Sequence, residues 1–305
     1  MGISPQRTLG AATGCRGIGL HCGQPVTMML RPAPPNSGIV FRRLDTGVEI
    51  GANWASTSES ALSTVLSNRE GMRIATVEHL MAAFAGSQVD NALVELDGPE
   101  VPIMDGSAAP FVAMIERAGL VRQDAARRGL KILKPVSVSD NGASATLLPE
   151  HGFSMSFAID FDNPLIRQQE IALRLEPGTF RDEIAPARTF GLLDDWPRLK
   201  AAGLARGGSL DNAVVVSGNR VLNNGGLRFV DEFVRHKLVD ALGDLYLAGG
   251  PIIGHFRGLR SGHALTRRLL FALFADLSAW CATTMPEATD FGALSRSNAD
   301  RLACA

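Results

Sequence analysis

The chain has 305 residues, with 30 basic and 31 acidic side chains and a formal net charge of −1. This balance excludes the basic surface on which nucleic-acid-binding proteins depend, and it excludes a polybasic protein that binds anionic membranes. Apolar residues make up 46% of the chain and charged residues 20%, which excludes disorder and at this length predicts about two domains.

The first part of the chain predicts an α+β unit. Short strands are expected at residues 26–30 and 39–43, and a proline-rich loop joins them. Apolar residues at helical spacing predict a helix over 74–85 that ends at Gly86, followed by a buried strand at 91–96.

A second helix and a second block of elements follow. Ser107 is expected to cap the helix, and Gly119 to close it. The second block begins near Arg128. Its expected strands lie at 130–138, 143–148, 153–161 and 251–257, and its expected helices at 229–247 and 263–280.

Two segments, 77–86 and 234–243, share a pattern in which Val-x-His is followed by Gly seven residues after the His. The likeness indicates a duplicated α+β unit, although chance repeats of this size explain it equally well. We expect one unit at 1–127, a second at 128–285 and a tail at 286–305.

The segment 188–226 interrupts the second block. It combines a Gly207-Gly208 pair, an apolar run at 213–216 and further loop glycines. This strand–turn–strand character indicates an insertion near a functional face.

Neither the N-terminal segment nor any other part of the sequence has the apolar run of a signal peptide or a membrane span. The four cysteines form no CxxC pair and no regular framework, as is typical of a reduced cytosolic protein. We therefore expect a cytoplasmic protein with no membrane span and no nucleic-acid partner.

His236 and Asp240 stand at positions i and i+4 of a predicted helix and therefore share a face. Such a pair can bind Zn²⁺ or a related ion, although a surface ion pair is the commoner outcome. His79 occupies the matching position of the other repeat. If the two helices pack together, the three side chains form a ligand set that leaves one position open for water.

Two further groups near these ligands are candidates for proton transfer. Glu78 points about 100° away from His79 on the helix, so it either takes a proton from a metal-bound water or is a solvated glutamate. His263 begins the last helix, and Asp244 lies one turn beyond Asp240. The Asp244–His263 pair either acts as a general acid or oxyanion stabiliser, or has only a structural role in which His263 caps the helix.

Several motifs occur in order along the chain and point to one family. They are Gly17-Ile-Gly-Leu-His21, Thr76-Val-Glu-His-Leu80, Ile103-Met-Asp-Gly-Ser-Ala-Ala-Pro-Phe111, Ala187-Arg-Thr-Phe-Gly191, His236-Lys-Leu-Val-Asp240-Ala-Leu-Gly-Asp244 and Ser261-Gly-His-Ala-Leu265. From about Gln6 to Trp280 the chain resembles the UDP-3-O-acyl-N-acetylglucosamine deacetylases, the zinc hydrolases of lipid A synthesis in Gram-negative bacteria.

The resemblance implies a role for each site residue and a fold. The implied metal ligands are His79, His236 and Asp240, holding Zn²⁺ or, in the cell, Fe²⁺. It also implies Glu78 as general base, His263 as the charged acid, Asp244 as its orienting partner, Thr189 as an oxyanion donor, and Lys237 and Phe190 as substrate contacts. The implied fold is α+β, with two similar βααβ-type units whose helices are sandwiched between two sheets, each unit carrying an insert.

The second insert, at about 192–226, is implied to form a passage for the fatty acyl chain, which predicts substrate contacts at Leu192, Gly208 and Val215. Arg260 and Lys237 are expected to meet the charge of the UDP-sugar. Relatives often carry Cys at the position of Ser63, near the metal. They also often carry Phe at the position of Leu192, so the sequence leaves the width of the acyl passage undetermined.

The expected function is hydrolysis of the N-acetyl amide of a UDP-3-O-acyl-N-acetylglucosamine. The alternatives are a metal-dependent deacetylase of another N-acyl sugar and a non-catalytic sugar- or lipid-binding module. We expect a monomer, and the small apolar end Leu302-Ala-Cys-Ala305 is a hypothetical site for a protease that controls turnover.

Overall fold

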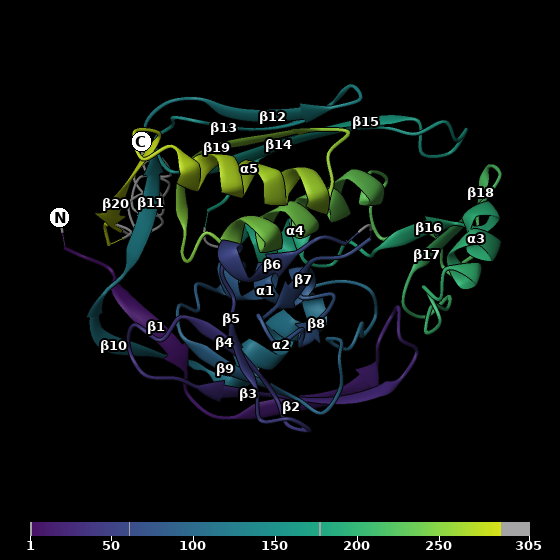
Figure 1. Cartoon of the computed structure of the whole chain (residues 1–305). Helices are drawn as coiled ribbons and strands as arrows, with labels where there is room; N and C mark the ends of the chain where they lie inside the picture. Colours follow the sequence, from purple (N-terminus) through teal and green to yellow (C-terminus); the bar gives the residue numbers. More distant parts are fainter. Residues whose placement is uncertain (1, 61, 177, 288–305) are drawn as a thin grey trace, which may run out of the picture.

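Two β-sheets form the outer layers of the protein, and helices fill the space between them (Figure 1). The computed structural model describes residues 2–60, 62–176 and 178–287. This arrangement confirms the α+β fold class expected from the sequence.

The first sheet is built from the N-terminal part of the chain. Its strands run in the order β2 (Thr13–Ile18), β3 (Pro25–Pro32), β9 (Ala92–Leu96), β4 (Ile39–Arg43) and β5 (Glu49–Gly51). Only β4 and β9 pair in parallel. Burial alternates along β4, with Ile39 and Phe41 buried, so one face of the sheet packs on the helices.

The second sheet has seven strands and comes from the C-terminal half. They are β11 (Arg128–Ile132), β12 (Val136–Asp140), β13 (Ala143–Leu148), β14 (Phe153–Asp160), β15 (Gln168–Arg174), β19 (Ile252–Leu259) and β20 (Trp280–Thr284). Strand β19 lies at the centre, since it pairs in parallel with β11 and β14 and antiparallel with β13.

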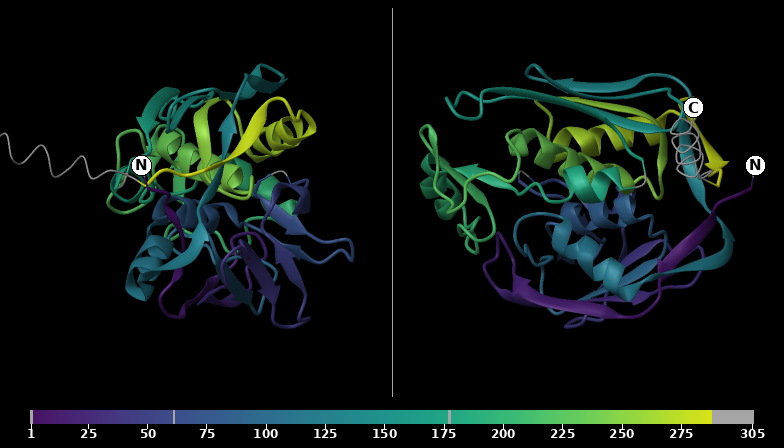
Figure 2. Two further views of the ribbon diagram at one scale, coloured as in Figure 1. Left: turned by 90° about the vertical axis from the view of Figure 1, so that its left-hand side faces the viewer. Right: turned by 180° about the vertical axis from the view of Figure 1, so that it is seen from behind.

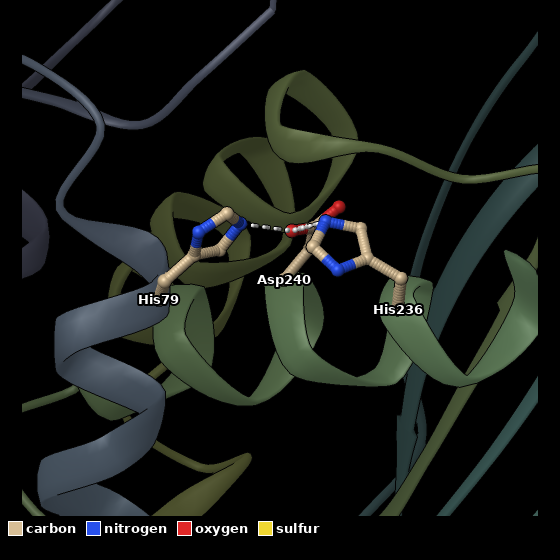
Figure 3. Close-up of side chains that lie close together, drawn as sticks. All are labelled: His79, His236 and Asp240. Atoms are coloured by element: carbon tan, nitrogen blue, oxygen red, sulfur yellow. Dashed lines mark ion pairs between the residues drawn. The ribbon is translucent and has the colours of Figure 1, made fainter. Parts of the chain in front are cut away.

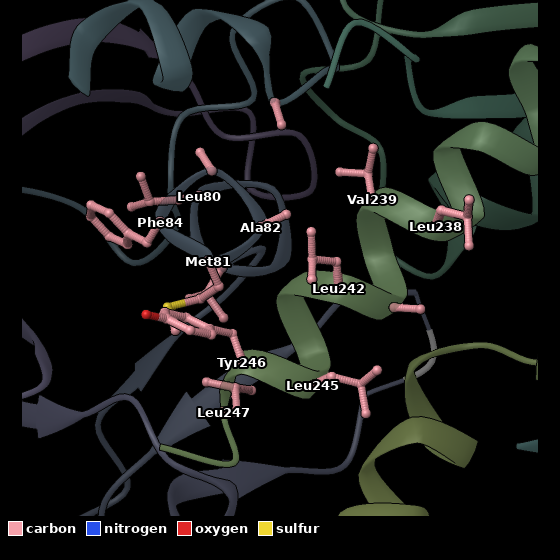
Figure 4. Close-up of a cluster of buried hydrophobic side chains, with 14 of the residues drawn as sticks. Leu80, Met81, Ala82, Phe84, Leu238, Val239, Leu242, Leu245, Tyr246 and Leu247 are labelled. Carbon is pink, nitrogen blue, oxygen red and sulfur yellow. The ribbon is translucent and has the colours of Figure 1, made fainter. Parts of the chain in front are cut away.

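Four helices lie between the sheets: α1 (Glu78–Ser87), α2 (Ala109–Ala118), α4 (Glu232–Tyr246) and α5 (His263–Ala275). The contact between α1 and α4 is apolar and buried, with Met81 and Leu242 among its side chains (Figure 4). Full burial of each such side chain stabilises the fold by about 1.5–3 kcal/mol.

Gly243 allows α4 to approach the first turn of α1 very closely. A Cβ atom at this position would overlap the backbone carbonyl of Glu78. The two helices therefore meet where both carry the candidate site residues.

Smaller elements surround this sandwich. They are β1 (Pro5–Leu9) with β10 (Leu120–Ala126); β6 (Thr57–Ser58), β7 (Val65–Ser67) and β8 (Arg73–Ile74); and β16 (Phe190–Leu192), β17 (Val214–Ser217), β18 (Arg220–Val221) and α3 (Trp196–Ala201) of the insert. Short helical turns lie at Trp54–Ser56, Phe180–Ile184 and Leu193–Asp195. The insert projects from one end of the sandwich (Figure 2).

The ends of the first two helices differ from the prediction. Helix α1 begins four residues later than expected, because residues 73–74 form β8 and Thr76 has a left-handed backbone with φ of 59°. It passes Gly86 and ends at Ser87, where Gln88 takes the left-handed cap. Ala108 rather than Ser107 is the cap of α2, whereas Gly119 closes that helix as predicted.

The second block also differs in its boundaries. The strand expected at 130–138 is two strands, separated by residues 133–135, which include a proline. Helix α4 begins at Glu232 rather than at residue 229. The last helix ends at Ala275, and Trp280 belongs to β20, because the backbone N–H and hydroxyl of Ser278 bind Asp276 and turn the chain.

The predicted division at residues 127 and 128 stays a prediction. The expected tail lies outside the described residues except for 286–287, and so does the Leu302–Ala305 end proposed for protease action. Within the described ranges, none of the helices combines the length and the apolar character that crossing a membrane requires.

Candidate active site

Three buried side chains from α1 and α4 converge on one point between the helices (Figure 3). The Nε2 atoms of His79 and His236 lie 3.5 Å and 3.2 Å from Oδ1 of Asp240. One potential ligand atom of each residue lies within 4.8 Å of the other two. The structure thus brings together all three side chains that the sequence predicts as metal ligands.

The hydrogen bonds of His236 decide which of its nitrogens faces this point. Its Nδ1 lies 3.0 Å from the backbone carbonyl of Ala187, which can only accept, so Nδ1 carries the proton. In the neutral ring, the lone pair of Nε2 then points at the Asp240 carboxylate, which is also an acceptor. Two acceptors repel each other unless a cation lies between them. Nε2 of His236 and the Asp240 carboxylate therefore fit a metal ion as ligands.

The charge states in this cluster also suit a metal ion. Burial lowers the pKa of His79, which favours the neutral ring that acts as a ligand. Burial alone would raise the pKa of Asp240, but Lys237 and the two histidines hold it well below its usual range. The Nζ atom of Lys237 lies 2.5 Å from Oδ2 of Asp240, which leaves Oδ1 for the ion.

Glu78 lies beside this cluster as the first residue of α1, and its side chain is buried. Its Oε2 accepts a hydrogen bond of 3.0 Å from the backbone N–H of Thr64, and its Oε1 lies 3.8 Å from Nε2 of His263. Burial raises the pKa of Glu78 to about 8, although the nearby His263 works against this shift. A carboxyl group with a raised pKa is a stronger base than an ordinary glutamate.

His263 and Asp244 form a hydrogen-bonded pair, with 2.9 Å between Nδ1 and Oδ2. Burial alone would lower the pKa of His263, but Asp244 and Glu78 outweigh burial and raise it to about 9. Its Nε2 lies 3.9 Å from Oδ2 of Asp240, so the ring presents a proton toward the metal ligands.

Thr64 is a site residue that sequence reasoning missed. Its hydroxyl donates to Oδ1 of Asp244 over 2.5 Å and lies 3.2 Å from Nδ1 of His263, while its N–H binds Glu78. Ser63, predicted to lie near the metal, lines a 410 Å³ cavity together with Thr64, Asp244 and His263. No motif in the sequence marks Thr64, because its role comes only from the packing of a loop against α1 and α4.

Two other predicted residues lie at the entrance to the insert. Phe190, the first residue of β16, packs edge-on against His236 with 6.4 Å between ring centroids. The N–H of Thr189 donates to the carbonyl of Gly106 over 2.8 Å, which ties this segment to the first unit. Phe190 therefore packs directly against His236, and Thr189 lies two residues from the carbonyl that orients this ring.

The structure places the remaining predicted substrate residues on the insert and after β19. Leu192 and Val215 are half-buried on the neighbouring strands β16 and β17, and Gly208 is exposed in a turn of the insert. Arg260 is exposed after β19, with φ of 49°. Among the described residues, no hydrogen bond or ion pair joins Arg260 or Gly208 to the three metal ligands.

Comparison with known proteins gives one consistent result. The family described as UDP-3-O-acyl N-acetylglycosamine deacetylase matches residues 6–275. A protein of Chromohalobacter salexigens named UDP-3-O-acyl-N-acetylglucosamine deacetylase is 48% identical over 294 residues, covering 95% of this chain and 97% of the relative. Proteins of the same name from Nitrosococcus oceani and Vibrio parahaemolyticus are 50% and 48% identical over 286 residues, each covering 92% of this chain and 94% of the relative.

Proposed function

The chain belongs to the UDP-3-O-acyl-N-acetylglucosamine deacetylase family, and we propose that the buried cluster around His79, His236 and Asp240 is its active site. The protein is a hydrolase that removes the N-acetyl group from UDP-3-O-acyl-N-acetylglucosamine in lipid A biosynthesis, releasing acetate and UDP-3-O-acyl-glucosamine. The observation that carries the assignment is the convergence of three ligand atoms beside the buried carboxyl group of Glu78 and the part-buried imidazole of His263.

The family is metal-dependent, and we assign Zn²⁺ as the ion, with Fe²⁺ as the alternative. His79, His236 and Asp240 would hold it, since neutral imidazole and carboxylate are ligands that both ions accept. When bound, the ion supplies Lewis-acid polarisation of the amide carbonyl and lowers the pKa of the attacking water.

The protein's own groups carry the protons. Glu78 takes a proton from the water as it attacks the amide carbon. The oxyanion that forms is stabilised by Thr189 and by the positive charge of His263, an effect typically worth about 3–4 kcal/mol for a single donor. His263 then gives its Nε2 proton to the leaving amine, and Asp244 holds the ring through Nδ1.

We assign substrate binding to the side chains around the insert. Lys237 and Arg260 would meet the charge of the UDP group, and Phe190 would contact the sugar. The insert at 192–226 would receive the acyl chain, with Leu192, Gly208 and Val215 as contacts. The apolar strand β17, on which Val214 and Val216 are buried and Val215 half-buried, supports this placement.

The same proposal covers the location and organisation of the protein. We assign it to the cytoplasm, where a UDP-sugar substrate is made, and we assign a monomeric state.

Each outer sheet draws its strands from one of the ranges 1–127 and 128–285, which supports two α+β units with that boundary.

The alkaline limit of activity is expected to follow His263. Its protonated ring is the acid, and its pKa is raised to about 9, so activity should fall as pH rises through that value. The acid limb follows Glu78, which must be deprotonated to act as the base and whose pKa is raised to about 8. Asp244→Asn removes the carboxylate that raises the pKa of His263 most, so the alkaline limb of kcat should move to lower pH. A pH–rate profile of the metal-loaded variant checks this, and an unmoved limb would exclude His263 as the acid.

Acetate release from matched sugars tests the function itself. The purified protein should release acetate from UDP-3-O-acyl-N-acetylglucosamine and far less from UDP-N-acetylglucosamine, which lacks the acyl chain. Equal rates on both, or a preference for another N-acyl sugar, would favour the alternative deacetylase. Stoichiometric binding without acetate would indicate a binding module instead.

A further inference from the structure

Glu232 is a completely buried carboxylate outside the proposed catalytic set. It is the first residue of α4 and has no solvent exposure. It accepts four hydrogen bonds: from Arg188 through Nε (2.8 Å), Nη2 (3.1 Å) and the backbone N–H (3.0 Å), and from the backbone N–H of Arg228 (2.6 Å). Burial alone would raise its pKa, but these donors hold the pKa below its usual range, so the carboxylate stays charged.

These bonds join the two ends of the insert. Arg188 lies just before β16, where the insert begins, and Arg228 lies just after its last glycines. The Nη2 atom of Arg188 also donates to the carbonyl of Gly226 over 2.8 Å. One carboxylate on α4 therefore holds the chain where it leaves the core and where it returns.

The clamped segment also contacts a candidate ligand just before Arg188 and carries the proposed oxyanion donor just after it. The preceding residue, Ala187, provides the carbonyl that orients His236. The following residue is Thr189, the proposed oxyanion donor. Glu232 itself lies four residues before His236, on the same face of α4. A shift of the clamp would therefore move a metal ligand's partner and an oxyanion donor together.

We propose that Glu232 and Arg188 are positioning residues that fix the acyl-binding insert relative to the metal centre. This inference rests on the proposed function, because it assigns the insert to the acyl chain. It predicts that weakening the clamp harms long-acyl substrates more than short ones and loosens the metal, since loss of a bond that orients a ligand typically weakens metal binding about 10–100-fold.

Three variants separate this role from simple stability. Arg188→Lys keeps the charge but cannot make all the bonds of the guanidinium fork. Glu232→Gln removes the negative charge and sets an amide NH₂ group against the N–H donors of Arg188 or Arg228. The double variant Arg188→Met with Glu232→Met removes both charges, which is often tolerated where loss of one partner is not. The control is Asp231→Asn, which breaks the part-exposed pair that Asp231 forms with Arg235 over 2.7 Å on the same helix.

Each variant is assayed for its unfolding midpoint, its Zn²⁺ dissociation constant, and kcat and KM on a long-acyl and a short-acyl UDP-sugar. We expect folded Arg188→Lys and the folded double variant to lose about 10–100-fold in kcat/KM on the long-acyl substrate, because small misplacements cost this much. At saturating Zn²⁺ the short-acyl substrate should lose less, because it shares the displaced metal site but makes fewer contacts with the insert. The Zn²⁺ dissociation constant should rise. Asp231→Asn should behave as wild type.

A wild-type ratio of long- to short-acyl kcat/KM and wild-type Zn²⁺ affinity in folded Arg188→Lys would overturn the inference. If wild type itself releases no acetate, the proposed function fails separately. Hydrogen exchange then tests the clamp alone: the insert should exchange faster in Arg188→Lys than in Asp231→Asn. Equal exchange in the two variants would contradict the clamp.

Discussion

Glu78→Gln is expected to lower kcat by about 10²–10⁴-fold while the protein keeps its metal, because it removes the general base and none of the ligands. The amide is nearly isosteric with the carboxyl group and can still accept the hydrogen bond from the N–H of Thr64. The fold should therefore be preserved. The measurement is kcat on the acylated substrate, alongside metal content in the same sample.

Glu95→Gln is the matched control for this prediction. Glu95 is also buried and lies on β9, where it pairs with Arg31 and Arg42. Its loss should leave kcat per folded molecule near wild type. If Glu78→Gln turned over at the wild-type rate with metal bound, another group would have to be the base.

His79→Ala is expected to abolish metal binding and activity together. Only two of the three ligands, His236 and Asp240, would remain, and a catalytic zinc site requires three from the protein. Loss of the ion removes several kcal/mol of transition-state stabilisation, so activity should fall by at least about a thousandfold. Metal analysis and acetate release on the purified variant check both effects.

His255→Ala provides the comparison for the ligand variant. His255 lies on β19 and binds the hydroxyls of Ser154 and Ser156, apart from the metal ligands. This variant should retain both metal and activity. Full metal occupancy in His79→Ala would overturn the ligand assignment, even if its activity were low.

The sequence marks His79 and His236 as equivalent positions because α1 and α4 carry the same local pattern, but it leaves open whether the two helices pack together. In each, a histidine is followed seven residues later by a glycine. The structure gives these glycines a physical role. A Cβ at Gly243 would overlap the Glu78 carbonyl, and one at Gly86 would overlap the ring of Phe180. The close packing at Gly243 is the contact that joins α4 to α1 and allows the histidines to face a common point.

Other parts of the site carry no signal that local sequence could provide. The Ala187 carbonyl fixes the proton of His236, yet any residue at that position would offer the same backbone group. Thr64 bonds to Glu78, 14 residues later, and to Asp244, 180 residues later, from a loop outside both helices. Glu232 is distinguished only by its burial and its four donors. These roles depend on tertiary packing, which periodicity and motif spacing do not encode.

In the proposed mechanism, one metal ion held by His79, His236 and Asp240 is required for deacetylation. The most direct test removes the metal with a chelator and returns Zn²⁺ in steps, measuring bound metal and acetate release on each sample. We predict that acetate release disappears with the metal and recovers to a plateau at one equivalent per chain. Undiminished release from the metal-free protein would contradict this mechanism.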